Sequence, residues 1–512
     1  MSATDRLREL EQENAQLSAD LATVKQQLDW FKRQLFGRKS DQRLDVDPAI
    51  QGNLLSALGV TPPPTPKDQL KETITYKRRK KTRDGAVNDT GLRFGDDVPR
   101  EIIAVTDPNI EAILEDRRVL IGEKVSYRLA QRPGSYVILE YTRPVYKILE
   151  DQTIVTTPAP ANVLDRSVAD VSFLAGMLVD KFCYHLPLYR QHQRLIQGGI
   201  QVSRSSLTTW GGRAIDLLRP IVDAQSRNLL QGRVLAMDET PIKAGRKKKG
   251  KMNQAYFWPM YGDTDEMVFH YAASRAHRHV QAFLGDFQGT LLSDGYEAYA
   301  AHAQRKEGVT HALCWSHCRR GFEKAQESEP TAVDEALALI GTLYRHEQII
   351  RDRQLEGDRK LAYRTQHSEP VVRAFWGWCD NQCHRPDLLP SSPLAKALKY
   401  AMVRQAGLQV FLGDPEVSID TNHLERGLRI IPTGRKNWLF CWTEIGAERV
   451  AVIQSLLVTC KLQGVDPYSY LVDVLQRISE HPAGQVADLT PRVWKTKFAD
   501  NPMQSDLALA GR

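Results

Sequence analysis

The chain has 512 residues, of which 42% are hydrophobic and 26% charged, with a formal net charge of +7. This length predicts roughly three or four structural units, and the composition excludes a disordered or low-complexity chain. The longest stretch of apolar and small residues, nine residues from Val171 to Val179, is far shorter than the roughly 20 residues of a membrane span. The polar start and the seven scattered cysteines indicate neither a secretory signal nor a disulfide framework, so we expect a cytoplasmic protein.

The N-terminal segment carries apolar residues in a heptad pattern. Steps of three and four residues alternate over four heptads, which is typical of a coiled coil. Asn14 falls at an a position, where a polar side chain favours one register and one oligomeric state. We predict dimerisation through residues 5–36, and the alternative is one amphipathic helix packed on its own chain. The predicted contact residues are Leu7, Leu10, Asn14, Leu17, Leu21, Val24, Leu28, Phe31 and Leu35.

Residues 37–99 are predicted to form a linker. The helix should end near Gly37, and the proline-rich stretch Thr61–Pro66 favours a semi-rigid spacer. Between positions 67 and 83 there are eight Lys and Arg residues against two acidic ones. Such a run indicates a polyanionic partner, with nucleic acid as the leading candidate, although solvated loops carry similar runs. The predicted DNA contacts in this run are Lys77, Arg78, Arg79, Lys80 and Lys81.

Two modules are expected to follow the linker. Residues 100–160 alternate apolar and polar side chains, which predicts a small β-rich module. Residues 167–225 are predicted to be helical, with one helix from Pro187 to about Gln197 and a second one capped by Ser203. This outline predicts a helix-turn-helix, and the alternative is two ordinary packed helices. Its second helix would offer DNA the side chains of Arg204, Ser205, Ser206 and Thr209.

Residues 230–328 interleave predicted strands and helices. Strands are expected at 234–237, 254–261, 267–271, 289–293 and 309–314, with helices at 277–284 and 296–303. Three strands followed by helix, strand, helix and strand predict an α/β core, a mixed sheet flanked by helices. Residues 330–412 are expected to form a helical insertion, 413–465 the second part of the core, and 466–512 a C-terminal helix and tail.

Two aspartates directly follow predicted strands of this core. Asp238 comes after the strand 234–237, and Asp294 after the strand 289–293. Carboxylates at the ends of adjacent strands repel each other unless a divalent cation lies between them. The pattern therefore predicts a metal site, although most strand-terminal aspartates are turn or cap residues.

A third carboxylate, Glu425, lies on a predicted helix that Asp420 or Asn422 could cap. Three carboxylates without a histidine cage favour Mg²⁺ or Mn²⁺. The expected chemistry is two-metal phosphoryl transfer, with two ions in each active site. Spacing alone leaves four rival carboxylates open, namely Glu239, Asp263, Asp265 and Asp286.

Eight short blocks stand out as a set: MDET (237–240), SDGY (293–296), CWSHCRR (314–320), NHLER (422–426), GRKNWLF (434–440), LFGRKS (35–40), HLPLYR (185–190) and SRS (203–205). In order and relative placement they resemble the blocks of the insertion sequence 66 family of bacterial transposases. The resemblance extends from residue 1 to about residue 480.

This resemblance implies a DDE transposase with a ribonuclease-H-like core, in which Asp238, Asp294 and Glu425 are the metal-binding triad. The implied reaction is metal-dependent cleavage at the ends of a mobile element, followed by attack of the freed 3′-hydroxyl on target DNA. Accessory proteins from the same element, a homodimer or higher oligomer, and a place beside the bacterial nucleoid are also implied. Two alternatives stay open: an inactive or domesticated relative that only binds DNA, and a metal-dependent nuclease without joining activity.

Members of this family typically carry a cysteine-rich zinc-binding module before the helical region. Residues 84–165 of this chain contain no cysteine, and a structural zinc needs four nitrogen or sulfur ligands, so we expect no structural zinc. Cys314 with Cys318, and Cys379 with Cys383 and His384, have spacings that a tetrahedral site could use. We expect these to be ordinary thiols.

Further DNA contacts are expected around the catalytic core. A second basic run, six Lys and Arg residues from Lys243 to Lys251, is expected in a loop after the first catalytic strand. Other cationic side chains and one tryptophan suit a distorted or single-stranded DNA end, although the tryptophan could equally belong to the core. The predicted contacts are Lys247, Lys248, Lys249, His317, Arg319, Arg320, Arg426, Arg435, Lys436 and Trp438.

Overall fold

The computed structural model describes residues 92–510, apart from positions 97, 114, 133, 150, 151, 249 and 440. These residues belong to one compact unit, Arg83–Arg512. The predicted coiled coil, nearly all of the linker with its basic run at 77–81, and Lys249 lie outside the described residues. None of the described helices has both the length and the apolar character that crossing a bilayer requires.

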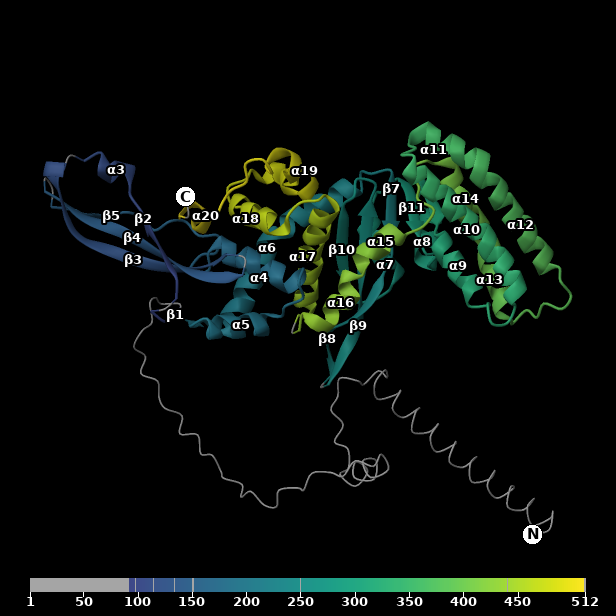
Figure 1. Cartoon of the computed structure of the whole chain (residues 1–512), viewed down its shortest axis with the longest axis horizontal. Helices are drawn as coiled ribbons and strands as arrows, with labels where there is room; N and C mark the ends of the chain where they lie inside the picture. Colours follow the sequence, from purple (N-terminus) through teal and green to yellow (C-terminus); the bar gives the residue numbers. More distant parts are fainter. Residues whose placement is uncertain are drawn as a thin grey trace, which may run out of the picture. The chain divides into compact units, whose positions relative to one another are not determined.

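A mixed six-stranded sheet forms the centre of this unit (Figure 1). Its strands are β7 (Val234–Met237), β8 (Thr240–Lys248), β9 (Lys251–Gly262), β10 (Met267–Ala272), β11 (Gly289–Ser293) and β12 (Val309–Leu313). The strand order is β10-β9-β7-β11-β12, with β8 paired to β9. Strand β9 runs antiparallel to β7 and β10, whereas β11 is parallel to β7 and β12. The expected α/β core is confirmed.

Helices cover both faces of the sheet because its central strands are apolar on both sides. All four residues of β7 are buried, as expected for a strand in the middle of a sheet. On one face of β9, Trp258 packs against Phe283 of α7 (His277–Leu284) and Tyr299 of α8 (Glu297–Arg305). The preceding residue, Phe257, points to the opposite face of β9 and contacts Trp442. Helix α17 (Glu444–Leu462) packs on β10 and on α6 (Arg204–Leu229).

Along the chain, a bundle of helices is inserted between β12 and the helix that carries Glu425, and it lies beside the central sheet (Figure 1). Trp315 anchors it by packing on Phe375 and Phe411 and by donating its indole N–H to the carbonyl of Leu408 at 2.7 Å. The bundle consists of α9 (Trp315–Glu323), α10 (Pro330–Asp352), α11 (Gly357–Tyr363), the π-helical turn η2 (Arg364–Ser368), α12 (Glu369–Cys383), α13 (Pro393–Val403) and α14 (Gln405–Gly413).

The N-terminal described segment folds as a β-rich module. Its sheet has the order β2-β4-β3, with β5 also paired to β4. The hydroxyl of Tyr141 donates to the Asp506 carboxylate at 2.6 Å, and Leu507 is buried among apolar residues of β3 and β4. The C-terminal helix α20 (Asp506–Ala510) therefore packs on this module. The elements of this N-terminal segment are β1 (Arg93–Phe94), β2 (Arg100–Ala104), α3 (Pro108–Glu111), η1 (Glu115–Arg117), β3 (Arg118–Arg132), β4 (Ser135–Ile148) and β5 (Ile154–Thr156).

The two helices expected around residue 200 are α5 (Leu188–Gln197) and α6. Ser203 caps α6 by accepting a hydrogen bond from the amide of Ser206 at 3.0 Å. Between the two helices, β6 (Ile200–Gln201) pairs with β1, and α6 continues to Leu229, beyond position 225, where the predicted helical region ends. The other helices of this region are α4 (Val171–Phe182), α18 (Pro467–Arg477), η3 (Ala483–Leu489) and α19 (Pro491–Lys497).

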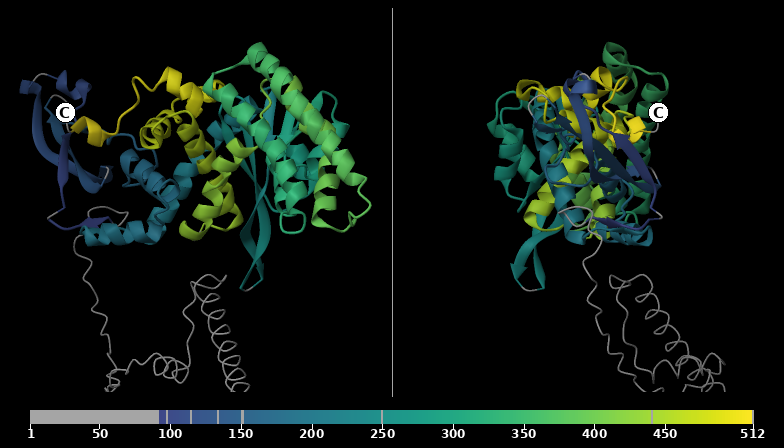
Figure 2. Two further views of the ribbon diagram at one scale, coloured as in Figure 1. Left: turned by 45° about the vertical axis from the view of Figure 1, so that its right-hand side comes forward. Right: turned by 90° about the vertical axis from the view of Figure 1, so that its left-hand side faces the viewer.

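The second basic run does not form the expected loop. Its residues lie in the β8–β9 hairpin, in which Lys243 pairs with Gln254 and Lys248 with Lys251. The hairpin projects from the central sheet in both directions of view (Figures 1 and 2). Its turn contains Gly250 with a φ of +74°, a conformation that glycine adopts without strain. The loop prediction was wrong because the charged residues hide the strand alternation.

Candidate active site

Asp238 and Glu239 lie between β7 and β8, beside the continuous neighbouring strand β9. The pairing register of β7 and β8 against β9 is continuous, which puts Pro259 opposite Asp238. The amide of Asp238 donates to the carbonyl of Pro259 at 3.4 Å, but proline has no N–H to return the hydrogen bond. The regular pattern of hydrogen bonds between strands is therefore incomplete at Asp238, next to Glu239.

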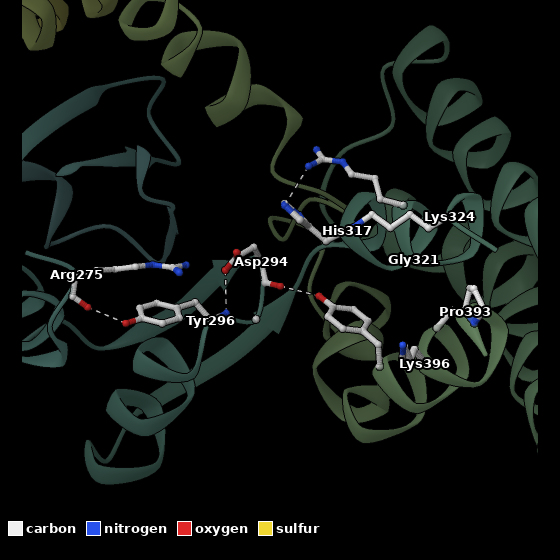
Figure 3. Close-up of a pocket in the computed structure, with 12 residues that line it drawn as sticks. Arg275, Asp294, Tyr296, His317, Gly321, Lys324, Pro393 and Lys396 are labelled. Atoms are coloured by element: carbon white, nitrogen blue, oxygen red, sulfur yellow. Dashed lines mark hydrogen bonds between the residues drawn. The ribbon is translucent and has the colours of Figure 1, made fainter. Parts of the chain in front are cut away.

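Asp294 directly follows β11 and begins a tight turn (Figure 3). Gly295 has a φ of +90°, and a Cβ atom there would lie 2.7 Å from Nε of Arg404, so the turn requires glycine. The amide of Tyr296 donates to Oδ1 of Asp294 at 2.8 Å, and the hydroxyl of Tyr400 donates to its carbonyl oxygen at 2.7 Å. Because β11 runs parallel beside β7, Asp294 and Asp238 emerge at the same edge of the sheet.

Three carboxylates meet at this edge. Asp238, Glu239 and Asp294 are partly buried, and each offers one oxygen that lies within 4.8 Å of the other two. Burial, followed by the charges of Asp294 and Glu239, raises the pKa of Asp238 to about 7. Like charges that share a poorly solvated site destabilise one another, and a cation between them removes that cost.

Glu239 is neutralised by protein groups. Arg275 donates to its carboxylate from Nε at 2.7 Å and also from Nη2. The hydroxyl of Tyr299, a fully buried residue, donates to the other oxygen at 2.7 Å. The Glu239 side chain is only 2% exposed, so these contacts fix its position. Arg275 therefore provides a counter-charge for Glu239 but not for Asp238.

Glu425 approaches from α15 (Asn422–Leu428), whose first turn is stabilised by Asp420 accepting from the amide of Asn422 at 3.0 Å. Its carboxylate accepts two hydrogen bonds from Nη2 of Arg320, at 2.5 and 2.8 Å. His317 lies 3.9 Å away, and burial lowers the pKa of this histidine. Glu425 adds to the charge that raises the pKa of Asp238, although it is not one of the three clustered carboxylates.

These side chains fit a divalent metal ion. Asp238 and Asp294 accept hydrogen bonds from backbone amides, while the guanidinium groups of Arg275 and Arg320 are bound to Glu239 and Glu425. The negative charge of the two aspartates is therefore available to a cation, and oxygen ligands of this kind suit Mg²⁺ and Mn²⁺.

The four rival carboxylates separate clearly in space. Asp263 caps the start of β7 by accepting from the amides of Arg233 and Val234. Asp265 accepts from the hydroxyl of Tyr261 in the turn between β9 and β10. Asp286 is exposed and pairs with Lys306 at 2.6 Å. Of the four, Glu239 is the one in the carboxylate cluster.

A cavity of about 640 Å³ opens beside Asp294 between the sheet edge, α9 and α13 (Figure 3). Its lining includes the cationic side chains of Arg320 on α9, Lys324 directly after α9 and Lys396 on α13, and also Arg275 and His317. An acidic centre next to a cationic cavity can bind metal and phosphate together, since the two kinds of charge attract different parts of one substrate.

Comparison with known proteins identifies the family. A family model described as "Transposase IS66 family" matches residues 166–449, and one described as "IS66 C-terminal element" matches residues 455–492. The chain belongs to the IS66 transposase family. The expected family is confirmed, and it implies a role in transposition with DNA as the substrate.

Two relatives of this transposase come from Sinorhizobium fredii. "Uncharacterized protein y4hP" is 30% identical over 429 residues, which covers 80% of this chain and 77% of the relative. "Uncharacterized protein y4jD" is 29% identical over 506 residues and covers 95% of this chain and 97% of the relative. The similarity therefore includes the N-terminal region that the family models do not reach.

The DNA contacts expected from the sequence of the transposase fall into separate places. His317 and Arg320 line the cationic cavity, whereas the neighbouring Arg319 is exposed and pairs with Glu323. Arg426 lines another cavity, beside Asp263 and Asp420. Arg204 and Ser205 are exposed at the start of α6, and Lys247 and Lys248 are exposed on the β8–β9 hairpin.

Trp438 does not lie on the surface. The residue is fully buried, with its ring against Phe182 and His185. Its burial fits the alternative that this tryptophan belongs to the core, because its position between Asn437 and Leu439 does not reveal which way its side chain points. Arg435 and Lys436 are exposed on α16 (Ile430–Asn437), and the aromatic residue that lines a cavity with them is Trp442.

Several residues of the site were missed by sequence reasoning. Arg275, Lys324, Lys396 and Tyr400 come from segments without a recognised motif, and only the folding of α9 and α13 against the sheet edge brings them to Asp294. Glu239 was not missed, since the sequence already indicated it as a rival carboxylate directly after Asp238. Two adjacent acidic residues at a buried strand end are costly unless both serve a purpose.

Proposed function

We propose that this transposase cuts and joins DNA by metal-dependent phosphoryl transfer, with Asp238, Asp294 and Glu425 as the metal-binding carboxylates. The observation that carries the proposal is the pair of aspartates at the ends of β7 and β11, facing one edge of the sheet beside a cationic cavity. The strand order β10-β9-β7-β11-β12, antiparallel in its first part and parallel in its second, supports a ribonuclease-H-like core.

In this proposal the side chains of the cavity position the DNA. Arg275, Lys324 and Lys396 line it near Asp294 and would bind phosphates on either side of the scissile bond. Arg320 would exchange its hydrogen bonds to Glu425 for hydrogen bonds to a phosphate, since a guanidinium group binds both anions well. This exchange would free Glu425 to join Asp238 and Asp294. Two bound divalent ions supply activation of the attacking oxygen and stabilisation of the leaving oxygen.

The proposal also includes dimerisation through the N-terminal residues. The heptad pattern of residues 5–36 supports a homodimer that brings two element ends together. If so, removal of residues 1–38 converts the dimer to a monomer in multi-angle light scattering. A truncated chain that stays dimeric would assign dimerisation to another surface.

The test is strand cleavage and strand transfer with Mg²⁺ on DNA that carries the ends of the element. Asp238→Asn, Asp294→Asn and Glu425→Gln should each lower both activities by about a hundred- to a thousandfold, as loss of an electrostatic catalyst does. Asp286→Asn is the control, because this carboxylate is exposed and pairs with Lys306. Full activity in one variant removes that residue from the triad, and full activity in all three overturns the proposal.

Glu239→Gln asks whether the fourth carboxylate also binds metal. Because Arg275 and Tyr299 already hold this side chain, we expect a loss of less than about tenfold, which is about 1.4 kcal/mol of transition-state stabilisation. A loss as large as that of Asp238→Asn would make Glu239 a metal ligand.

Cleavage without joining by the unchanged protein would instead indicate a nuclease.

A further inference from the structure

A second cavity, of about 450 Å³, lies between the β8–β9 hairpin and α16. Its floor is apolar and consists of Ile242, Met252 and the indole ring of Trp442. Lys243, Arg435 and Lys436 line the same cavity, and all three are exposed. The residues that line it include no acidic side chain.

The aromatic part of this cavity is held in place before any ligand arrives. Trp442 donates its indole N–H to the carbonyl of Arg435 at 3.2 Å, and its own carbonyl accepts from the amide of Gly245 at 2.9 Å. Its ring packs against Phe257, with ring centroids 6.4 Å apart. The guanidinium group of Arg435 donates to the carbonyl of Pro241 at 3.2 Å. A fixed, partly exposed indole loses little entropy when a second ring stacks on it.

An apolar floor with three cations at its rim matches one chemical class of ligand. Unpaired nucleotides stack their bases on aromatic side chains and place their phosphates on Lys and Arg. A base pair inside a duplex offers its faces only to its neighbours, so a base must leave the stack to enter such a cavity. A purely apolar ligand would not use the three cations.

The cavity is also close to the proposed site of DNA cleavage. Pro241, which lines it, follows Asp238 by three residues along the continuous path of β7 and β8, a distance of about 10 Å at the rise of a β-strand. Beyond the cavity the hairpin continues with Arg246, Lys247 and Lys248, which are exposed. A DNA strand that leaves the carboxylates along β8 would therefore reach the cavity first and the basic hairpin next.

We propose that this cavity binds one unpaired nucleotide of a DNA end, with its base against Trp442 and its phosphates on Lys243 and Lys436. The inference rests on the proposed function, since it assumes that DNA reaches the carboxylate cluster. It adds a site that distinguishes an unpaired DNA end from an intact duplex.

The test measures binding in EDTA, so that no cleavage occurs. The probes are a fluorescein-labelled oligothymidine, the same oligomer with abasic residues, and a blunt duplex, each followed by anisotropy with the full chain. The unchanged protein should bind oligothymidine at least about tenfold more tightly than the abasic oligomer, because the abasic residues have no base to stack. Trp442→Ala should abolish this preference and Trp442→Phe should keep it. Equal binding of the two oligomers by the unchanged protein overturns the proposal.

The cationic rim has its own variant, which avoids the packed indole. Lys243→Ala combined with Lys436→Ala changes two exposed side chains and should weaken oligothymidine binding by about tenfold or more while binding of the blunt duplex changes less than twofold. Arg353→Ala with Arg359→Ala, two exposed cations of the helical bundle, is the matched control. An equal loss for oligomer and duplex, or no loss, contradicts the assignment.

These outcomes separate the inference from the proposed function. If the unchanged protein cuts and joins DNA but the cavity variants bind oligothymidine normally, the inference fails alone. If Asp238→Asn leaves cleavage intact while the cavity variants lose oligothymidine binding, the proposed triad fails and the nucleotide site stands.

Discussion

Arg320 donates two hydrogen bonds to the carboxylate of Glu425, at 2.5 and 2.8 Å, across 105 residues of sequence. The guanidinium group thus provides the positive charge that Glu425 needs while it faces the partly buried Asp238. A metal ion that binds Glu425 must displace this group.

Arg320→Gln should therefore raise the affinity of the DNA-free protein for Mn²⁺, because the ion no longer competes with a guanidinium group. An increase of about tenfold corresponds to one charge-assisted hydrogen bond. Titration calorimetry measures it, with Arg319→Gln as the control, since that neighbouring arginine pairs with Glu323. Weaker Mn²⁺ binding in Arg320→Gln would show that the arginine supports the metal site instead of competing with it.

Lys324, directly after α9, and Lys396 of α13 line the cationic cavity. Replacing both by alanine should weaken duplex binding and lower the slope of log K against log salt by about 0.9 for each DNA phosphate that the protein no longer neutralises. Anisotropy at several KCl concentrations gives this slope. The double variant Arg353→Ala/Arg359→Ala removes the same charge elsewhere on the helical bundle and should leave the slope unchanged. An unaltered slope in the cavity variant would mean that its lysines do not touch phosphate.

Arg364 is fully buried in the helical bundle. It donates to both carboxylate oxygens of Glu347 at 2.8 Å and to the carbonyl oxygen of Phe411 at 2.7 Å. Arg364→Met should lower the free energy of unfolding by about 3–5 kcal/mol, because Glu347 is left buried without its counter-charge.

Urea unfolding measures this loss, and the double variant Arg364→Met/Glu347→Leu should recover part of it by removing the unpaired charge. A single variant that loses less than about 1 kcal/mol, the range of exposed ion pairs, would contradict the argument.

His270 of β10 stacks on Phe283 with ring centroids 4.5 Å apart. Burial lowers its pKa from 6.5 to about 4. Between these values the unfolded chain binds more protons than the folded one, so the stabilising effect of neutral His270 is complete above pH 6.5 and is lost as the pH falls toward 4. The loss at pH 4 is up to about 3 kcal/mol.

His270→Phe keeps the ring and removes the titrating group, so its thermal stability should fall less steeply between pH 6.5 and pH 4. Differential scanning calorimetry over this range compares it with His384→Phe, a change at an exposed histidine. Parallel stability curves for His270→Phe and the unchanged protein would exclude His270 as a source of acid sensitivity.

The amino-acid sequence was sufficient to predict features that depend on local order. Strands β7 and β11 were predictable because each is a short buried apolar run that ends at an aspartate, and the start of α6 because Ser203 is an effective helix cap. Asp238, Asp294 and Glu425 were found through these elements and through motif blocks. These sequence patterns each extend over only a few residues, so they can be recognised without knowledge of the fold.

Only the tertiary structure decided which of the distant residues meet. Arg275 reaches Glu239, Arg320 reaches Glu425, and α20 returns to the β-rich module through contacts that link segments far apart in the chain. Whether Trp438 or Trp442 is exposed likewise depends on how α16 and α17 pack on the sheet. Sequence periodicity predicts which face of a helix or strand is apolar. Which other element packs on that face depends on the packing of the whole core.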